Sequence, residues 1–294
     1  MAIGVVVATF FLLRIVPGDP AEAILGDRAS PSSVLALRHQ LGLDRPWWRQ
    51  FTDFVAQVAL HFDTGKSLQY GQPTRELVFA HAGPSLAIVG LAIVFTLVIA
   101  VPLALLAATH KDGVLDHVIR IVPAVGFAMP VFWLGLLLVL LFAVRLHWLP
   151  VGGSDHGLAS FVLPAVAVAL ALAPPILRSL RAQLLEVLEA DFVVTARAAG
   201  LSRTRVLVMH VLRNAALPTL TLFGLNIAYL LGGTLVVEQV FAIQGVGALL
   251  FQAISTRDFP VVQGVALYTA VLVVVATVVT DLAVDRLDPR TRRA

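Results

Sequence analysis

Residues 84–108 read PSLAIVGLAIVFTLVIAVPLALLAA, an apolar run of 25 residues without one charged side chain. About 20 such residues cross the hydrocarbon core of a bilayer as an α-helix. The whole chain shares this character, because 59% of its 294 residues are hydrophobic and only 13% are charged, against about 25% in an ordinary soluble domain. Too little polar surface remains to cover such a core in water. We therefore predict an all-α, polytopic membrane protein.

Other apolar runs extend this prediction to about six transmembrane helices. Four of them are long and cover residues 121–144, 161–177, 217–237 and 261–284. A further run at residues 1–16 is shorter than the roughly 20 residues of a full span, and it lacks the basic region and cleavage site of a signal peptide. We interpret it as a first transmembrane helix that is short or truncated.

Prolines and glycines inside these runs indicate local departures from straight, evenly packed helices. Interruptions are expected where proline removes a backbone donor, at Pro164, Pro174 and Pro175. Kinks are expected at Pro102, Pro123 and Pro130, and Pro218 marks the start of the fifth span. Glycines within spans are expected to allow close helix packing; they are Gly90, Gly126, Gly135, Gly224, Gly232 and Gly233.

The polar stretch at residues 17–83 is predicted to fold as a small cap between the first and second helices. Residues 31–38 have the pattern of a short capped helix. Residues 47–62 carry apolar side chains at helical spacing and begin with Trp47 and Trp48. We expect this second helix to turn its aromatic side toward the membrane surface.

The distribution of lysine and arginine predicts the orientation in the membrane. Residues 109–120, residues 178–213 and the tail after residue 284 together carry twelve of these residues, and the alternate connections, 145–160 and 238–260, carry two. Cytoplasmic connections are the basic ones. Six helices with both termini in the cytoplasm satisfy this count and make the cap extracytoplasmic.

Residues 180–217 form the most informative connection, because this stretch is amphipathic. Residues 192–199 favour a helix, Gly200 is a suitable C-terminal stop, and Ser202 can cap a second helix. Two short helices joined at a glycine would project as a knob whose alanines allow close approach to another protein. A basic loop that only satisfies the topology is an equal alternative from spacing alone.

Residues 191–202 read DFVVTARAAGLS and residues 210–218 read HVLRNAALP. Together they resemble the EAA loop of ABC importer permeases, and specifically the B-type subunit of the dipeptide, oligopeptide and nickel branch. Val194 stands where the general consensus has glutamate, as is usual in this branch. Weaker matches follow in order over nearly the whole chain: VPGDPA at 16–21, LGLD at 41–44, FWLG at 132–135, WLPVGG at 148–153, LGGT at 231–234, GVG at 245–247, RDFPVVQG at 257–264 and LDPR at 287–290.

The resemblance implies a type I ABC importer permease fold, with a core at residues 84–294 that holds five transmembrane helices and a cytoplasmic coupling loop at 182–213. It implies that this loop docks an ATPase subunit through Asp191, Thr195, Ala196, Arg197, Ala199, Gly200, Leu201 and Ser202. The implied partners are a second, homologous permease subunit in a heterodimer, two ATP-binding cassette subunits that bind ATP and Mg, and an extracytoplasmic substrate-binding protein. Di- or oligopeptides are the expected cargo, with nickel or another small solute as the alternative.

No catalytic, cofactor or metal site is predicted on this chain, and no nucleic acid partner. Gly65, Lys66 and Ser67 resemble the end of a phosphate-binding loop, but Leu60 stands where the motif needs glycine. The histidines have no metal-ligand spacing, and cysteine is absent.

Two acidic residues near membrane depth are functional candidates by default. Asp281 lies near the inner end of the sixth helix, where an interfacial role is expected. Glu238 either faces the transport pathway or is a structural partner of a loop amide. The alternative class, a secondary transporter or channel without an ATPase, should show buried ion sites or an inverted repeat; the spans carry almost no charge and the chain no convincing repeat.

Overall fold

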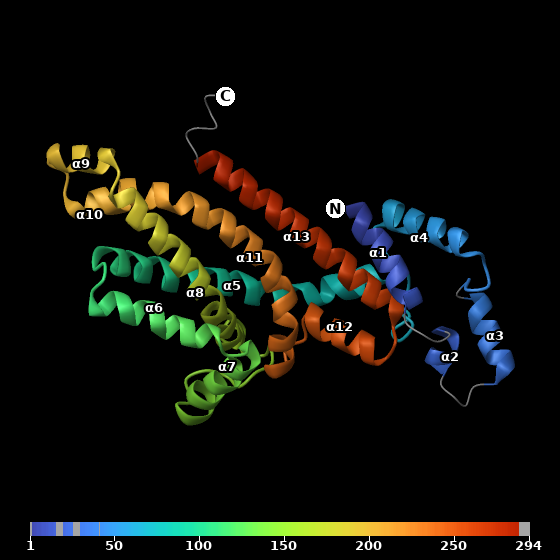
Figure 1. The fold of residues 1–294 in the computed structure, drawn as a ribbon. Coiled ribbons are helices and arrows are strands. Elements are labelled where there is room, and N and C mark those ends of the chain that lie inside the picture. Colours follow the sequence, from blue (N-terminus) through green and yellow to red (C-terminus); the bar gives the residue numbers. More distant parts are fainter. Residues whose placement is uncertain (1, 16–19, 26–29, 41, 288–294) are drawn as a thin grey trace. The chain divides into compact units, whose positions relative to one another are not determined.

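The computed structural model describes residues 2–15, 20–25, 30–40 and 42–287, and regular structure within these ranges is helical except for one isolated β-bridge. The chain divides into two compact units. Unit 1 comprises Met1–Ser85 and Gln244–Val274, and unit 2 comprises Leu86–Ile243 and Val275–Ala294. Two long helices, α5 (Thr74–Thr109) and α13 (Phe259–Leu287), contribute to both units (Figure 1).

Unit 1 contains four short helices of the N-terminal region, α1 (Ala2–Ile15), α2 (Pro20–Leu25), α3 (Pro31–Gln40) and α4 (Trp47–His61), and a fifth short helix from later in the chain, α12 (Val246–Ser255). The helices predicted at 31–38 and 47–62 are confirmed as α3 and α4. Phe54 and Val58 of α4 are buried against Phe10 of α1. Trp47 and Trp48 are exposed, and their contact with a membrane surface stays a prediction.

The loop between α4 and α5 is fastened to the start of α13 by one buried carboxylate. Asp258 is 1% exposed and accepts hydrogen bonds from the Ser67 hydroxyl (2.5 Å) and from the backbone N–H groups of Leu68 and Gln69 (3.1 Å each). Thr64 Oγ1 donates to the carbonyl oxygen of Pro260 at 2.8 Å. The segment that resembles the end of a phosphate loop is therefore a structural clasp.

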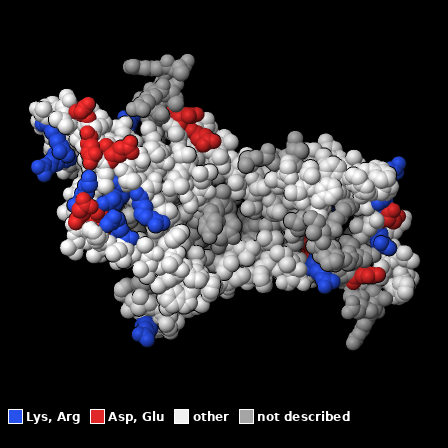
Figure 2. Space-filling model, in the orientation of Figure 1, with Lys and Arg blue, Asp and Glu red and all other residues white. Residues whose placement is uncertain are grey.

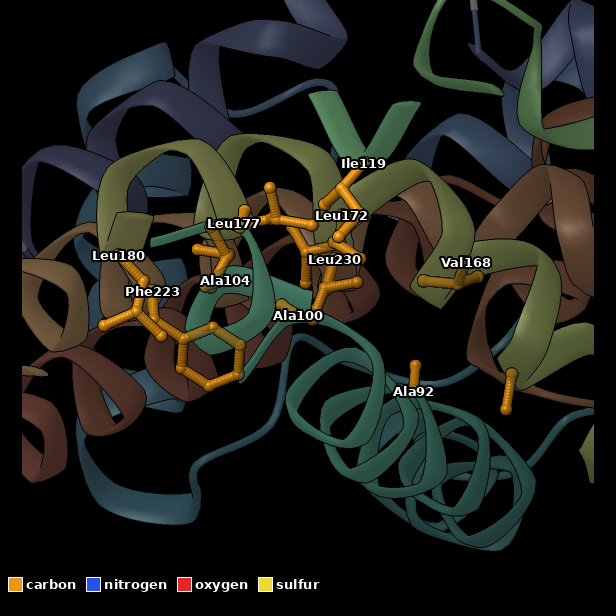
Figure 3. Packing of buried hydrophobic residues seen from close by; sticks show 14 of the residues in the cluster. Ala92, Ala100, Ala104, Ile119, Val168, Leu172, Leu177, Leu180, Phe223 and Leu230 are labelled. Atoms are coloured by element: carbon orange, nitrogen blue, oxygen red, sulfur yellow. The ribbon is translucent and has the colours of Figure 1, made fainter. Parts of the chain in front are cut away.

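Unit 2 is built around α8 (Ala159–Leu188), which packs against α6 (Val114–Phe127), α7 (Val131–Leu138) and α11 (Leu212–Val240). The apolar window of α8 is the most buried of the membrane-length helices. Ala100 and Ala104 of α5 belong to the same buried cluster as Leu177 of α8 and Leu230 of α11 (Figure 3). Small side chains such as these leave room for neighbouring side chains between packed helices.

The segment after α7 returns onto the end of α11. A π-helix, η1 (Val139–Arg145), leads into this segment, and the Gly153 N–H donates to the carbonyl oxygen of Phe241 at 2.8 Å. A Cβ atom at Gly152 would overlap that same carbonyl group, and one at Gly135 would lie 3.0 Å from the Phe241 ring. Phe241 is 1% exposed. Gly135 leaves room for its ring, and Gly152 leaves room for its backbone carbonyl.

Four described helices are long and apolar enough to cross a membrane, and a fifth span results if α6 and the α7–η1 segment count as one. The all-α, polytopic class is thus confirmed. Of the six predicted spans the first is α1, whose 14 residues fall short of the roughly 20 required. The predicted domain bounds 1–16, 17–83 and 84–294 stay predictions, although α5 begins at Thr74 and runs across the second boundary.

Several predictions about helix breaks were wrong. Pro164, Pro174 and Pro175 lie inside the continuous helix α8. Proline is tolerated within membrane helices because neighbouring helices can satisfy the carbonyl groups that it leaves without a donor. Pro218 lies within α11 rather than at its start. The span predicted at 121–144 is broken at Pro130, where α6 and α7 meet at 102°.

The glycine predictions have mixed outcomes. A Cβ atom at Gly224 would overlap Thr280, and Gly135 packs on Phe241, which agrees with close packing. A Cβ atom added at Gly90 or Gly126 would meet no atom within 4 Å. The prediction that these two glycines allow close helix packing is therefore wrong within this chain. The surroundings of Gly232 and Gly233 lie outside the described part.

Candidate docking site

A projecting element follows α8. It consists of α9 (Asp191–Ala198), α10 (Arg203–Arg205) and the π-helix η2 (Val206–Val211), which continues into α11 (Figure 1). Gly200 has φ +85°, a conformation that costs glycine little, and it turns the chain between the two helices. The Ser202 hydroxyl accepts the Arg205 N–H at 3.4 Å. The predicted helix, glycine stop and serine cap are confirmed.

One side of α9 is anchored to the chain itself. Val193 of α9 and Val206 of η2 are each 1% exposed and belong to the core of unit 2. Ala196 and Leu201 are half-buried against the same core. The knob is therefore a fixed part of unit 2.

The other side of α9 is exposed and combines apolar and charged side chains. Phe192 is 42% exposed and Val194 is 66% exposed. Six of the eight predicted docking residues are also exposed: Asp191, Thr195, Arg197, Ala199, Gly200 and Ser202. Figure 2 shows lysine, arginine and acidic side chains gathered over the end of unit 2 that carries α9. Apolar contact residues within a polar rim are typical of a protein-binding patch.

Sequence reasoning missed the apolar contribution to this surface. Phe192 and Val194 flank Val193 in the helix, and three consecutive side chains of a helix cannot share one face. Because Val193 is the buried one, the two neighbours are exposed. The periodicity contained this signal, but the core-facing member of the three could not be identified before the packing of η2 was known.

The base of the knob is connected to α6 by charged side chains. Asp116 of α6 is 0% exposed and accepts hydrogen bonds from Arg181 of α8, at 2.6 Å from Nε to Oδ1 and 2.5 Å from Nη2 to Oδ2. Lys111 lies in the turn between α5 and α6, and its Nζ is 3.3 Å from Oε1 of Glu189, which comes just before α9. Arg181 and Asp116 are 65 residues apart, so the local sequence around either residue gives no signal of the pair.

The two acidic candidates differ in their surroundings. Glu238 is 0% exposed, and its backbone carbonyl accepts the Ile243 N–H at 2.9 Å. Asp281 is exposed near the end of α13. A pathway role for Glu238 and an interfacial role for Asp281 stay predictions.

Comparison with known proteins gives matches along the whole chain. The family model described as "Binding-protein-dependent transport system inner membrane component" matches residues 100–293, and the model for the N-terminal part of such membrane components matches residues 1–97. The di/tripeptide transport system permease protein DppB of Pseudomonas aeruginosa (strain UCBPP-PA14) is 36% identical over 321 residues, covering 98% of this chain and 94% of the relative. The dipeptide transport system permease protein DppB of Escherichia coli (strain K12) is 32% identical, with coverages of 99% and 94%.

A solved structure shares the fold. A chain from inward-facing conformations of the MetNI methionine ABC transporter aligns with a TM-score of 0.62 and 18% identity, and it covers 72% of this chain and 96% of that chain. At this identity the likeness shows the fold alone.

Proposed function

The chain belongs to the family of binding-protein-dependent transport system inner membrane components, and from this premise we propose that it is a permease subunit of an ATP-driven importer of di- or oligopeptides. It forms half of the translocation pathway and docks an ATPase subunit through α9. The full-length likeness to dipeptide and di/tripeptide permeases supports the cargo. A secondary transporter or channel that works without an ATPase is not favoured.

The observation that carries the ATPase-docking role is the construction of α9. Val193 fixes the helix to unit 2, and Phe192, Val194 and Arg197 are presented outward. A helix that is rigidly based on the membrane core can transmit a push from a partner, whereas a free loop would absorb it. Only contacts that differ between two states of the complex can drive such a change.

The proposed assembly contains a second homologous permease subunit, two ATP-binding cassette subunits that bind ATP and Mg, and an extracytoplasmic binding protein that delivers the peptide. The proposed location is the cell membrane, with several spans and both termini in the cytoplasm. The excess of lysine and arginine in the connections that include α9 and the C-terminal tail supports this orientation.

Reconstitution tests the function directly. The chain is incorporated into proteoliposomes with its partner permease, the two ATPase subunits and the binding protein, and uptake of a radiolabelled dipeptide is measured. We expect uptake that requires ATP and the binding protein. Uptake that follows an ion gradient without ATP would instead support the secondary-transporter alternative.

Substitution of the apolar docking residues tests the surface. We expect the Phe192→Asp, Val194→Asp double variant to weaken capture of the ATPase subunits about 30-fold or more, since the loss of even one residue central to an interface costs about 2 kcal/mol. The measurement is co-purification with increasing ATPase subunit, and Val194→Thr, which keeps the side-chain shape without adding charge, should retain capture. Equal capture by all three chains would contradict a docking role.

These two positions are better probes than Ala196 or Gly200. Ala196 packs against the core of unit 2, so a bulky residue there would disturb the fold as well as the surface. Gly200 has a positive φ, which strains any other residue. Phe192 and Val194 can be changed with little effect on the packing beneath α9.

A further inference from the structure

The Asp116–Arg181 pair has features that distinguish it from the other ion pairs of the described chain. Both carboxylate oxygens of Asp116 are engaged by one guanidinium group, at 2.6 and 2.5 Å, and Oδ2 also accepts the Asp112 N–H at 3.1 Å. Asp116 is 0% exposed, and the Arg181 side chain is 13% exposed. Bidentate, charge-assisted pairs of this kind are the strongest polar contacts in proteins.

The pair joins two segments that have different neighbours. Arg181 lies in the last turns of α8, which lead to α9 through Glu189 and Ala190. Asp116 lies in the first turn of α6, which continues to the 102° bend and α7. The pair therefore spans from the base of the docking helix to the start of the bent segment.

Burial makes this connection stiff. Separating two charges that are shielded from water costs far more than separating an exposed pair, because neither group regains full solvation. The neighbouring Lys111–Glu189 pair joins the same two regions, but its side chains are 52% and 74% exposed, so it adds little. α6 and the last turns of α8 consequently move together as long as Asp116 holds Arg181.

Arg120 provides an internal comparison. Its Nε lies 3.9 Å from Asp116 Oδ1, four residues further along the same helix, and this Nε is buried without a hydrogen-bond partner. Arg120 adds positive charge beside Asp116, yet it cannot connect α6 to α8. The bridging contact belongs to Arg181.

We propose that Asp116 and Arg181 are positioning residues for coupling: the pair transmits the movement of the ATPase-docked α9 to α6 and the bent α6–α7 segment. This inference rests on the proposed function, because it presupposes an ATPase on α9. It is separate from docking, since both residues lie beneath α9 in unit 2 rather than among the exposed docking residues.

The decisive variant replaces both members of the link, so that neither Asp116 nor Arg181 is left behind as a buried charge without the other. Apolar replacement of both members of a buried pair is often tolerated, whereas loss of one member is strongly destabilising. The Asp116→Leu, Arg181→Met double variant is reconstituted with the partner permease, ATPase subunits and binding protein. ATPase capture, ATP hydrolysis and dipeptide uptake are then measured, with Arg120→Gln as the matched control.

We expect the double variant to capture ATPase subunits and hydrolyse ATP, but to transport about fivefold or more fewer dipeptides per ATP, the lower end of typical allosteric coupling. Arg120→Gln should transport as the unsubstituted chain does. Unchanged transport per ATP in the double variant would overturn the proposal. Failure of the unsubstituted chain to capture ATPase subunits would instead refute the proposed function, so the two failures are distinguishable.

A second measurement applies if the double variant does not fold. The chain has no native cysteine, so Asp116→Cys with Arg181→Cys presents only two thiols on this chain. Bridging them with a bifunctional thiol reagent before reconstitution should restore the transport that the unbridged variant lacks. Equal transport with and without the bridge would count against a mechanical link.

Discussion

Replacement of Gly152 by alanine is expected to lower the free energy of unfolding by about 3 kcal/mol or more, the upper range for overpacking a buried site. The added Cβ atom would overlap the backbone carbonyl of Phe241. A side chain could rotate away, but this carbonyl is fixed by the end of α11 and accepts the Gly153 N–H. Thermal unfolding of the detergent-solubilised chain, followed by circular dichroism, measures the loss.

Gly90→Ala is the matched control. Gly90 lies in α5 with no atom near the position of a new Cβ, and alanine is favoured over glycine in a helix by up to about 1 kcal/mol. We expect this variant to unfold at the same temperature as the unsubstituted chain or higher. Equal stability of the two variants would show that the segment after η1 can shift away from α11.

The second large effect is expected at Asp258. Its replacement by alanine leaves the Ser67 hydroxyl and the N–H groups of Leu68 and Gln69 without their acceptor. Each hydrogen bond to a charged group contributes about 1.5–3 kcal/mol. Since water can reach part of this loop after the change, we expect a net loss of about 3–5 kcal/mol.

Limited proteolysis measures this effect locally. The segment between α4 and α5 should become cleavable in Asp258→Ala at protease concentrations that leave the unsubstituted chain intact. Asp281→Ala, which removes an exposed acid from α13, the helix that follows Asp258, should keep the original pattern. Resistance of the segment in both variants would mean that Thr64 and its bond to Pro260 hold the loop without Asp258.

Local sequence signals predicted the elements whose causes are local. The helix at 192–199, the stop at Gly200 and the cap at Ser202 depend on neighbouring residues only, and each was confirmed. The apolar run at 261–284 corresponds to α13 for the same reason. Family resemblance added the meaning of the 182–213 segment, which spacing alone left open between a docking knob and a basic loop.

Features that depend on distant residues could not be predicted. Pro174 and Pro175 indicate a break locally, yet the burial of α8 among α6, α7 and α11 keeps the helix continuous. Asp116 and Arg181 each read as an ordinary charge in a basic connection, because their pairing depends on how α6 crosses α8. At Pro130 the difference has the opposite sign. A kink within one span was predicted there, and the structure has two separate helices that meet at 102°.

The two adjacent prolines of α8 have a mechanical consequence. Pro174 and Pro175 have no N–H to donate to the carbonyls of Leu170 and Ala171, four residues earlier in each case. Two successive rungs of the helical ladder are therefore missing, so α8 can flex at this level without breaking a backbone hydrogen bond there. The pivot lies between residues 159–173 of α8 and residues 176–188, which bear Arg181 and lead to α9; both halves carry buried side chains. A bend at this level would tilt the half of α8 that bears Arg181, and α9 with it as one body, relative to residues 159–173.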